Sequence, residues 1–472
     1  MALRAFRRRA SDADAVAPEL APPAAAVPSR PGPDPAVLPV VRGRHIIDVD
    51  TSGDHPLITM IPPGLRKAAN RLPLANLAMV LPKLAGVATN FWVRSLTYPM
   101  NSALPAPRMT PKFMGLIALD EVVLGAFKTP SRLPSGPEIQ RVGAELREAH
   151  RHYEARGWLD NPRAYHRMPP VPAMRVTAKS SRGVKYEHLT WESSYAPSEG
   201  EPGRQRWLAK TSNQTGHAYV LRHPEPDRPW VMCIHGLGTG IPIADFTLFR
   251  VAELHRELGY NVVLPVLPLH GPRRNGRRLD EFMTYDLVDT IHGVAHGIWD
   301  LRTVLGWIRM QGGTRIGVHG VSLGGYLTAI LATLDGGLDF ALAGVPVVDV
   351  PELYAFHAPR NLRRRGHEVG LLGSVTHDVH RVISPLTLRP LVPVERRGVY
   401  GALGDRMSTA AQAHRLWLHW EQPHHRWFSG NHTTFLLDAD ARQFVTERYF
   451  DWFGTHGATD AAATLDAAPA SA

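Results

Sequence analysis

Residues 316–331 read IGVHGVSLGGYLTAIL, and this stretch decides the expected fold. Its centre, from Gly320 to Gly324, has the pattern glycine, any residue, serine, any residue, glycine. The β-branched residues before it are typical of a buried strand, and the residues after it are good helix formers. A serine at such a turn lies on strained backbone that exposes its hydroxyl, while the glycines avoid collisions with neighbouring elements. We therefore predict that Ser322 is a nucleophile.

A serine hydroxyl is a weak nucleophile at neutral pH and needs a base that takes its proton. In chains with this turn, an acid and then a histidine follow the serine along the sequence. Asp405 follows the predicted strand 399–403, and His432 follows the strand-like residues 425–428. Both lie just past the carboxyl ends of strands, where open α/β sheets place their sites. We predict His432 as the general base and Asp405 as the acid that orients its ring.

Other residues compete for these two roles. Asp349 follows the strand that ends near Val345, and it would serve if the acid lay one strand earlier. His424 and His425 are rival bases, but they precede a strand, as solvated loop histidines do. Paired histidines also suggest a metal site. No second cluster with ligand spacing accompanies them, so we expect neither a metal nor another cofactor.

The glycine-rich loop 235–240 follows the buried-strand run 230–234. Backbone N–H groups of such a loop, together with the N–H next to the nucleophile, hold the negative oxygen of a tetrahedral intermediate. We predict Leu323 and Leu237 as these two donors, and Gly238 is an alternative to Leu237. The loop lacks the Gly-Lys-Ser/Thr ending of a phosphate-binding loop and a complete dinucleotide fingerprint.

The order of segments along the chain indicates the domain organisation. After about residue 171, strand-like and helix-like segments alternate, which predicts an α/β domain with a mainly parallel sheet and helices on both faces. The expected parts are a disordered leader (1–40), a mainly helical N-terminal extension (41–170), the α/β domain (171–457) and a disordered tail (458–472). Residues of about 350–396, between two strands of the domain, are expected to form a lid.

The N-terminal extension has helix signals of its own. Ser135 before Pro137 predicts a helix start, and Gly157 predicts its end. Residues 61–94 mix apolar and basic side chains, which suits a helical layer on the next domain or contact with a membrane surface. Pro82 and Lys83 interrupt the apolar run there, so we predict no membrane-spanning helix.

Two observations bear on the cellular compartment. No apolar segment of a secretory signal follows Met1, and we expect a cytoplasmic location. The single cysteine, Cys233, lies in an apolar run, which excludes an internal disulfide and predicts a buried thiol.

The chain is basic, with 53 Lys and Arg against 43 Asp and Glu and a net charge of +10. No recognition pattern of a nucleic-acid binder accompanies this charge, so we expect no nucleic-acid partner. Two arginine clusters should lie on the same face as Ser322. They are Arg273, Arg274, Arg277 and Arg278, and Arg360, Arg363, Arg364 and Arg365. We hypothesise that they attract an anionic acyl substrate or a membrane leaflet, with solvated loop charge as the alternative. The residues predicted to contact the substrate are His235, Gly236, Arg273 and Arg274.

Taken together, these motifs resemble the α/β-hydrolase superfamily over about residues 215–455. The resemblance rests on the His-Gly pairs at 235–236 and 270–271, the turn at 320–324, Asp405 and His432. The chain is also similar to uncharacterised bacterial hydrolases with a helical N-terminal extension. The long extension and the Gly-Asn-His form of the histidine motif depart from the common pattern.

The resemblance implies an α/β-hydrolase fold with a lid and the activity of a serine hydrolase. Such an enzyme, of esterase or lipase type, would cleave a carboxylic ester or thioester through an acyl-enzyme on Ser322. Two alternatives stay open: an acyltransferase that uses the same three residues, and a non-catalytic binding protein that keeps the fold. The sequence specifies neither the acyl chain, the leaving group nor the oligomeric state.

Overall fold

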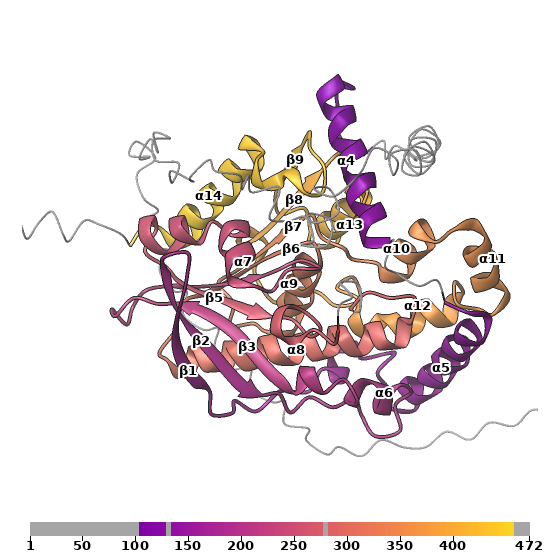
Figure 1. The fold of residues 1–472 in the computed structure, drawn as a ribbon. Helices are drawn as coiled ribbons and strands as arrows, with labels where there is room; N and C mark the ends of the chain where they lie inside the picture. The colour runs from indigo at the N-terminus through magenta and orange to yellow at the C-terminus, as the bar shows by residue number, and fades with distance from the viewer. Residues whose placement is uncertain (1–102, 129–133, 277–281, 457–472) are drawn as a thin grey trace, which may run out of the picture. The chain divides into compact units, whose positions relative to one another are not determined.

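The computed structural model describes residues 103–128, 134–276 and 282–456, all within one compact unit. The predicted leader (1–40), the tail (458–472) and the segment 61–94 lie outside these residues. The described part forms a nine-stranded sheet in the order β1-β2-β3-β5-β4-β6-β7-β8-β9 (Figure 1). The strands are β1 (Arg175–Ser181), β2 (Val184–Glu192), β3 (Thr215–Leu221), β4 (Trp230–Ile234), β5 (Asn261–Val266), β6 (Ile316–Val321), β7 (Phe340–Gly344), β8 (Arg397–Ala402) and β9 (His424–Phe428).

The sheet is mainly parallel, as the alternating segments predict. The pairings β1·β2, β2·β3 and β3·β5 are antiparallel. The five that follow, β5·β4, β4·β6, β6·β7, β7·β8 and β8·β9, are parallel. The carboxyl ends of the parallel strands therefore meet at one edge, where loops from several strands come together.

Both faces of the sheet are covered, and strand β4 shows why its sequence is apolar throughout. Met232 and Ile234 pack into one hydrophobic cluster, whereas Val231 and Cys233 pack into the cluster on the opposite face. Successive side chains of a strand point to opposite faces, so a strand covered on both sides needs apolar residues at every position. Cys233 is buried, as predicted.

The covering helices divide between the same two clusters. The first cluster contains side chains of α8 (Leu287–Met310), α9 (Leu323–Leu334) and α13 (Ala410–His419). The second contains side chains of α7 (Pro242–Leu248) and α14 (Ala439–Phe453). Figure 1 shows α8 and α14 on opposite sides of the sheet. The predicted α/β fold with helices on both faces is confirmed.

The helical segment that follows β4 is interrupted in the structure. Helix α7 ends at Leu248, and a short π-helical turn occupies Glu253–Glu257. Between them Arg250 has φ 50°, a left-handed conformation that breaks a right-handed helix. The segment ends before Gly259, which has φ 73°, a conformation that suits glycine.

Two helices of the N-terminal extension are described, α4 (Pro111–Lys128) and α5 (Gly136–Ala155). Ser135 caps α5 as predicted: its hydroxyl accepts the N–H of Glu138, whose carboxylate in turn accepts the N–H of Ser135. The buried face of α5 joins the first hydrophobic cluster, against α8 and the lid helix α12 (Ser374–His380). This helix of the extension therefore shares the core of the α/β domain.

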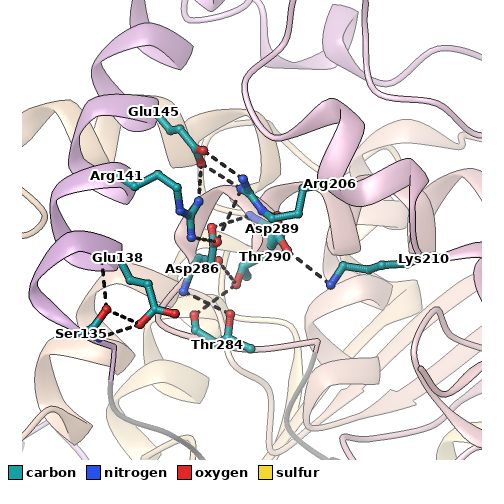
Figure 2. A network of polar contacts seen from close by, with 10 residues as sticks. All are labelled: Ser135, Glu138, Arg141, Glu145, Arg206, Lys210, Thr284, Asp286, Asp289 and Thr290. Carbon is teal, nitrogen blue, oxygen red and sulfur yellow. Dashed lines mark hydrogen bonds and ion pairs between the residues drawn. The ribbon is translucent and has the colours of Figure 1, made fainter. Parts of the chain in front are cut away.

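A polar network fastens α5 to the start of α8 (Figure 2). Arg206, on the short helix α6 (Arg204–Leu208), donates to both carboxylate oxygens of Glu145 at 2.9 and 2.8 Å and to Asp289 at 2.8 Å. Arg141 on α5 bridges Glu145 and Asp286, the N-cap of α8. Three helices are thus joined by charge-assisted hydrogen bonds whose members are mostly shielded from solvent.

The insertion between β7 and β8 corresponds to the predicted lid. It contains α10 (Val350–His357), α11 (Arg360–Glu368) and α12, followed by two short 3₁₀ turns. Among the described helices of the chain, none has the length and apolarity that a bilayer crossing requires.

Candidate active site

Ser322 lies at the turn between β6 and α9 with φ 57° and ψ −117°. This left-handed region is strained for any residue with a side chain. The flanking glycines permit the turn: a Cβ at Gly320 would collide with the carbonyl oxygen of Gly324, and a Cβ at Gly324 would collide with that of Ile234. The predicted strand-to-helix turn is present, and it leaves Ser322 half-buried beside the end of β4.

The structure brings Ser322, His432 and Asp405 together. His432 Nε2 lies 2.9 Å from Ser322 Oγ, and His432 Nδ1 lies 2.7 Å from Asp405 Oδ2. Asp405 follows β8 and His432 follows β9, so two neighbouring parallel strands deliver the two side chains to the same edge of the sheet. The contacts form one continuous hydrogen-bond chain from carboxylate to hydroxyl, the arrangement needed to activate a serine.

The surroundings of Asp405 favour its ionised form. Burial alone would raise its pKa, but the neighbouring His432 ring and hydrogen bonds from Ser408 and Met407 outweigh burial, and the pKa of Asp405 is lowered. The N–H groups of Met407 and Ser408 donate to Asp405 Oδ1 at 2.8 and 2.9 Å. A carboxylate held in this way accepts the Nδ1–H of the histidine and leaves Nε2 free to take a proton.

Burial by itself would lower the pKa of His432, but two carboxylates reverse that effect. Asp405 acts through its charge and its hydrogen bond, and Asp120 acts through its charge, so the pKa of His432 is raised above 6.5. A raised pKa makes the imidazole a better proton acceptor. It also stabilises the imidazolium that forms when the hydroxyl proton is transferred.

Asp120 and Ser408 did not emerge from the sequence as site residues. Asp120 lies on α4 in the N-terminal extension, far from the triad along the chain, and is completely buried. The sequence contains one indication of this role: Asp120 and Glu121 are adjacent acids inside an apolar helical run. Buried carboxylates are uncommon, and those that occur have an interaction partner. Ser408 Oγ lies 2.8 Å from Asp405 Oδ2 and 3.2 Å from His432 Nδ1, a placement that only the loop's conformation creates.

The predicted oxyanion donors, Leu323 and Leu237, lie on the two segments that meet at Ser322. Neither backbone N–H has a hydrogen-bond partner among the residues that the structure describes. A Cβ added at Gly236 would lie 3.4 Å from Ser322 Cβ, so the glycine loop passes directly beside the nucleophile. Gly238, the alternative donor, has φ 84°. The loop geometry fits the predicted role, which stays a prediction.

His235 holds this loop and does not face a substrate, which corrects the predicted contact. Its side chain is completely buried. Nδ1 lies 2.8 Å from the Gly236 carbonyl oxygen, and Nε2 accepts the N–H of Leu267 at 3.1 Å. Burial lowers the pKa of His235 to about 4, so the ring is neutral and Nε2 can accept. Both ring nitrogens are therefore used to fix the backbone.

The rival residues have other duties. Asp349 caps α10 through the N–H of Glu352 and pairs with Arg415 at 3.0 Å. His424 and His425 do not precede a strand but begin β9. His424 Nδ1 contacts Arg448 at 3.0 Å, and the ring of His425 packs against Trp417. None of the three contacts Ser322 in the described part of the chain.

Arg273 is a core residue, and the prediction that it binds substrate is wrong. Its side chain is 0% exposed and pairs with Asp300 at 2.7 Å. It also donates to the carbonyl oxygens of Val266 and Asn213 at 2.9 and 2.8 Å. A buried guanidinium needs such partners, and sequence alone did not reveal that they exist. Arg274 is half-buried, and Arg277 and Arg278 lie outside the described residues.

The second arginine cluster belongs to the lid. Arg363, Arg364 and Arg365 are exposed on α11. Arg364 pairs with Glu368 at 3.7 Å, and both side chains are largely in solvent. Among the arginines of the two clusters whose exposure the structure describes, Arg363, Arg364 and Arg365 are exposed, whereas Arg273 is buried and Arg274 is half-buried.

A cavity of about 390 Å³ lies between α5, the start of α8 and the lid helices α10 and α11. Tyr285, Tyr354 and Leu362 are among the apolar side chains that line it, and the network of Figure 2 borders it. No triad residue lines this cavity. Within the described residues, no group of three or more histidine, cysteine, aspartate or glutamate side chains is arranged to hold a metal ion.

Comparison with known proteins adds relatives by sequence. No family model matches the chain. It is 39% identical over 347 residues to "Uncharacterized protein MT2702" of Mycobacterium tuberculosis strain CDC 1551 / Oshkosh, across 72% of this chain and 83% of that protein. It is 38% identical, over the same shares, to "Uncharacterized protein Rv2627c" of strain ATCC 25618 / H37Rv.

Solved structures with similar chain traces include two acetyl xylan esterases. The enzyme from Paenibacillus sp. R4 is 14% identical, with a TM-score of 0.45 over 63% of this chain and 93% of its own. Acetyl xylan esterase 1 from Thermoanaerobacterium sp. JW/SL YS485 is 15% identical, with a TM-score of 0.43 over 62% and 92%. By sequence the chain belongs to the family of the mycobacterial proteins MT2702 and Rv2627c, and its sheet order and the strand-to-helix turn at Ser322 are those of the α/β-hydrolase fold.

Proposed function

We propose that this protein is a serine hydrolase that cleaves a carboxylic ester or thioester through an acyl-enzyme on Ser322. The observation that carries the proposal is the unbroken hydrogen-bond chain from Asp405 through His432 to Ser322, at 2.7 and 2.9 Å. The strained backbone of Ser322 supports the same reaction, as do the N–H groups of Leu323 and Leu237, which have no hydrogen-bond partner in the described part of the chain.

The first half-reaction forms the acyl-enzyme. His432 Nε2 takes the hydroxyl proton while Ser322 Oγ bonds to the carbonyl carbon, and the carbonyl electrons move onto its oxygen. The N–H groups of Leu323 and Leu237 hold that oxyanion, and Asp405 stabilises the imidazolium. Collapse of the intermediate breaks the bond to the leaving oxygen or sulfur, which receives the proton from His432.

The second half-reaction repeats these steps with water as the nucleophile. His432 takes a proton from water, hydroxide bonds to the acyl carbon, and the ester bond to Ser322 breaks as His432 returns the proton to Oγ. The products are a carboxylic acid and the free enzyme. An acyltransferase would use an alcohol or amine in place of water at this step.

The exposed arginines of the lid support a further detail of the proposal, namely that the acyl substrate carries a negative charge. Arg363, Arg364 and Arg365 are exposed on α11. Clustered, solvent-facing guanidinium groups attract phosphate or carboxylate groups over distances of about 10 Å at moderate salt. We propose that these three arginines raise the local concentration of a substrate that carries such a group.

Hydrolysis of p-nitrophenyl esters and acyl thioesters of graded chain length tests the proposal. The wild type should release the leaving group in a burst equal to the enzyme concentration, followed by slower turnover, because the acyl-enzyme forms before water clears it. Ser322→Ala should show neither phase. Equal rates from the wild type and Ser322→Ala would contradict the proposal, and an alcohol acceptor that diverts the acyl group would favour the acyltransferase.

A further inference from the structure

Asp120 of the N-terminal extension connects the two loops that carry the triad's acid and base. We call residues 404–408 the acid loop and residues 430–434 the base loop. Asp120 Oδ2 accepts the N–H of Arg406 at 3.0 Å and the N–H of His432 at 2.9 Å. One carboxylate oxygen thus binds the residue after Asp405 and the general base itself. The other oxygen, Oδ1, is buried without a hydrogen-bond partner among the described residues.

The rest of the contacting face of α4 docks on the same two loops. The side-chain amide of Asn431 donates to the Leu116 carbonyl oxygen at 2.6 Å. Phe113 and Ile117 form a small apolar cluster with Leu403, and they lie so close to Gly404 that a Cβ there would approach each to 3.0 Å. Residues spaced three and four apart lie on one helix face, so Phe113, Leu116, Ile117 and Asp120 act as one docking surface.

Energetics favour a role beyond packing. A buried carboxylate is expensive to desolvate, and burial together with the charge of Asp405 raises the pKa of Asp120 to about 7. An apolar residue of similar size would avoid that penalty. Hydrogen bonds from backbone N–H groups to a carboxylate are shorter and stronger than those to neutral acceptors. The two N–H donors here belong to Arg406, which follows Asp405, and to His432, so Asp120 acts on both loops that set the geometry of the triad.

We propose that Asp120 is a positioning residue of the active site, which holds the acid loop and the base loop in register so that His432 stays aligned between Asp405 and Ser322. The inference rests on the proposed function for its catalytic meaning. It also assigns helix α4 to the catalytic unit: the extension supplies a part of the active site that the α/β domain does not contain.

Two variants separate positioning from packing in the full-length protein. Asp120→Asn keeps the size and one acceptor oxygen but removes the charge, whereas Asp120→Ala removes both. Asp438→Asn is the control. Asp438 is likewise a carboxylate that accepts a backbone N–H, that of Ala441, but it caps α14 and contacts neither Asp405 nor His432 among the described residues. Thermal unfolding of each variant checks that it is folded.

Two readouts are measured between about pH 5 and pH 9. The first is the second-order rate constant for fluorophosphonate labelling of Ser322. The second is the titration of His432 in protein labelled with carbon-13 histidine, assigned with His432→Gln. The titratable groups that act on Asp120 are Asp405 and His432, and its charged neighbours are Glu121 on its own helix and Arg406 on the acid loop.

The expected results differ between the variants. Asp120→Ala should label about tenfold to hundredfold more slowly at the optimal pH, because a small misalignment of the base has a large effect on rate. Asp120→Asn should move the acid limb of labelling and the His432 titration to lower pH, because a negative charge near the imidazolium is lost. Asp438→Asn should match the wild type in both readouts.

Coincident labelling profiles and coincident His432 titrations for the wild type and Asp120→Asn would overturn the proposal and leave Asp120 a packing residue. A wild type that does not label at any pH would refute the proposed hydrolase activity instead. The His432 titration would still decide the role of Asp120, because it requires no turnover.

Discussion

Ser322 combines a half-buried hydroxyl with an unfavourable backbone conformation. Residues in such sparsely populated conformations cost about 1–3 kcal/mol, so the surrounding structure must hold them. Here the Ser322 N–H donates to the Gly344 carbonyl oxygen at 2.8 Å, and the Ser322 carbonyl oxygen accepts the N–H of Tyr326 at 3.0 Å. Ser322 is therefore fixed by neighbouring strand β7 on one side and by the first turn of α9 on the other.

The two candidate acids give a matched pair of substitutions. Asp405→Asn should lower kcat/KM by about 10⁴-fold, because an amide cannot hold the correct tautomer of His432 or stabilise its imidazolium. Asp349→Asn should leave kcat/KM close to the wild-type value, because Asp349 caps α10 and pairs with Arg415. Ester hydrolysis at saturating and limiting substrate provides both constants. Similar losses in the two variants would mean that Asp405 is not the catalytic acid.

Sequence patterns predicted Ser322, Asp405 and His432, which the structure brings together, because each follows a strand in a recognisable motif. Asp120 could not be found in this way, since its contacts to Arg406 and His432 depend on how α4 packs. Arg273 was misjudged for the related reason that its buried partner, Asp300, lies on a different element. Side chains that act through tertiary contacts leave little trace in local sequence.

At the scale of elements, the loop beside the nucleophile rests on a buried carboxylate of α7. Asp245 Oδ1 accepts the N–H of Gly240 at 3.2 Å, and Oδ2 has no partner in the described part of the chain. Burial raises the pKa of Asp245 to about 7 from an ordinary value of 3.8. Between these two pH values the folded protein binds a proton that the unfolded chain has lost, so stability falls as pH rises through this range.

Asp245→Asn should remove that pH dependence, because an amide stays neutral. Its free energy of unfolding should exceed that of the wild type by on the order of 3 kcal/mol above pH 7, with a much smaller difference near pH 4. Urea unfolding of both proteins at several pH values provides the comparison. A difference that does not change with pH would show that Asp245 titrates normally.

The network of Figure 2 predicts how firmly the extension is attached. Arg206→Ala should lower the free energy of unfolding by about 1–3 kcal/mol, because it leaves the carboxylates of Glu145 and Asp289 with a lost partner in a mostly buried setting. Arg364→Ala is the control: its pair with Glu368 is solvent-exposed and contributes little. Chemical denaturation measures both, and equal effects would contradict the argument.

The central strands could be predicted because double burial demands continuous apolar runs, as in β4 and β7. Strand β1 was not predicted, since most of its residues are exposed and its sequence has no apolar face. It forms through backbone pairing with β2 across a turn at Arg182 and Gly183, both with positive φ. Pairing of that kind depends on the neighbouring strand more than on local sequence.

At the scale of the whole molecule, the net charge of +10 includes a cluster of three arginines, Arg363, Arg364 and Arg365, that are exposed on α11. Replacing Arg363, Arg364 and Arg365 with glutamine should lower kcat/KM severalfold for a carboxylate- or phosphate-bearing ester at low salt. A neutral ester of equal chain length should be unaffected, and added salt should remove the difference. Unchanged rates for both esters at low salt would refute the proposed attraction.

The extension and the α/β domain together form the candidate catalytic unit. Helix α5 shares the main hydrophobic cluster with α8, and α4 binds the loops of Asp405 and His432. The sequence boundary near residue 171 therefore marks a change of secondary structure and does not separate two cores. Sequence composition indicates where the secondary structure changes, whereas only the packing of side chains shows which segments share a core.

The most direct measurement is the covalent adduct of a fluorophosphonate probe, located by mass spectrometry in the wild type, Ser322→Ala and His432→Ala. The account predicts one adduct, on Ser322 of the wild type, and no labelling of either folded variant, because only a serine with an aligned base attacks the probe. An adduct on a different residue, or an unlabelled but folded wild type, would contradict the claim that Ser322, His432 and Asp405 form a working triad.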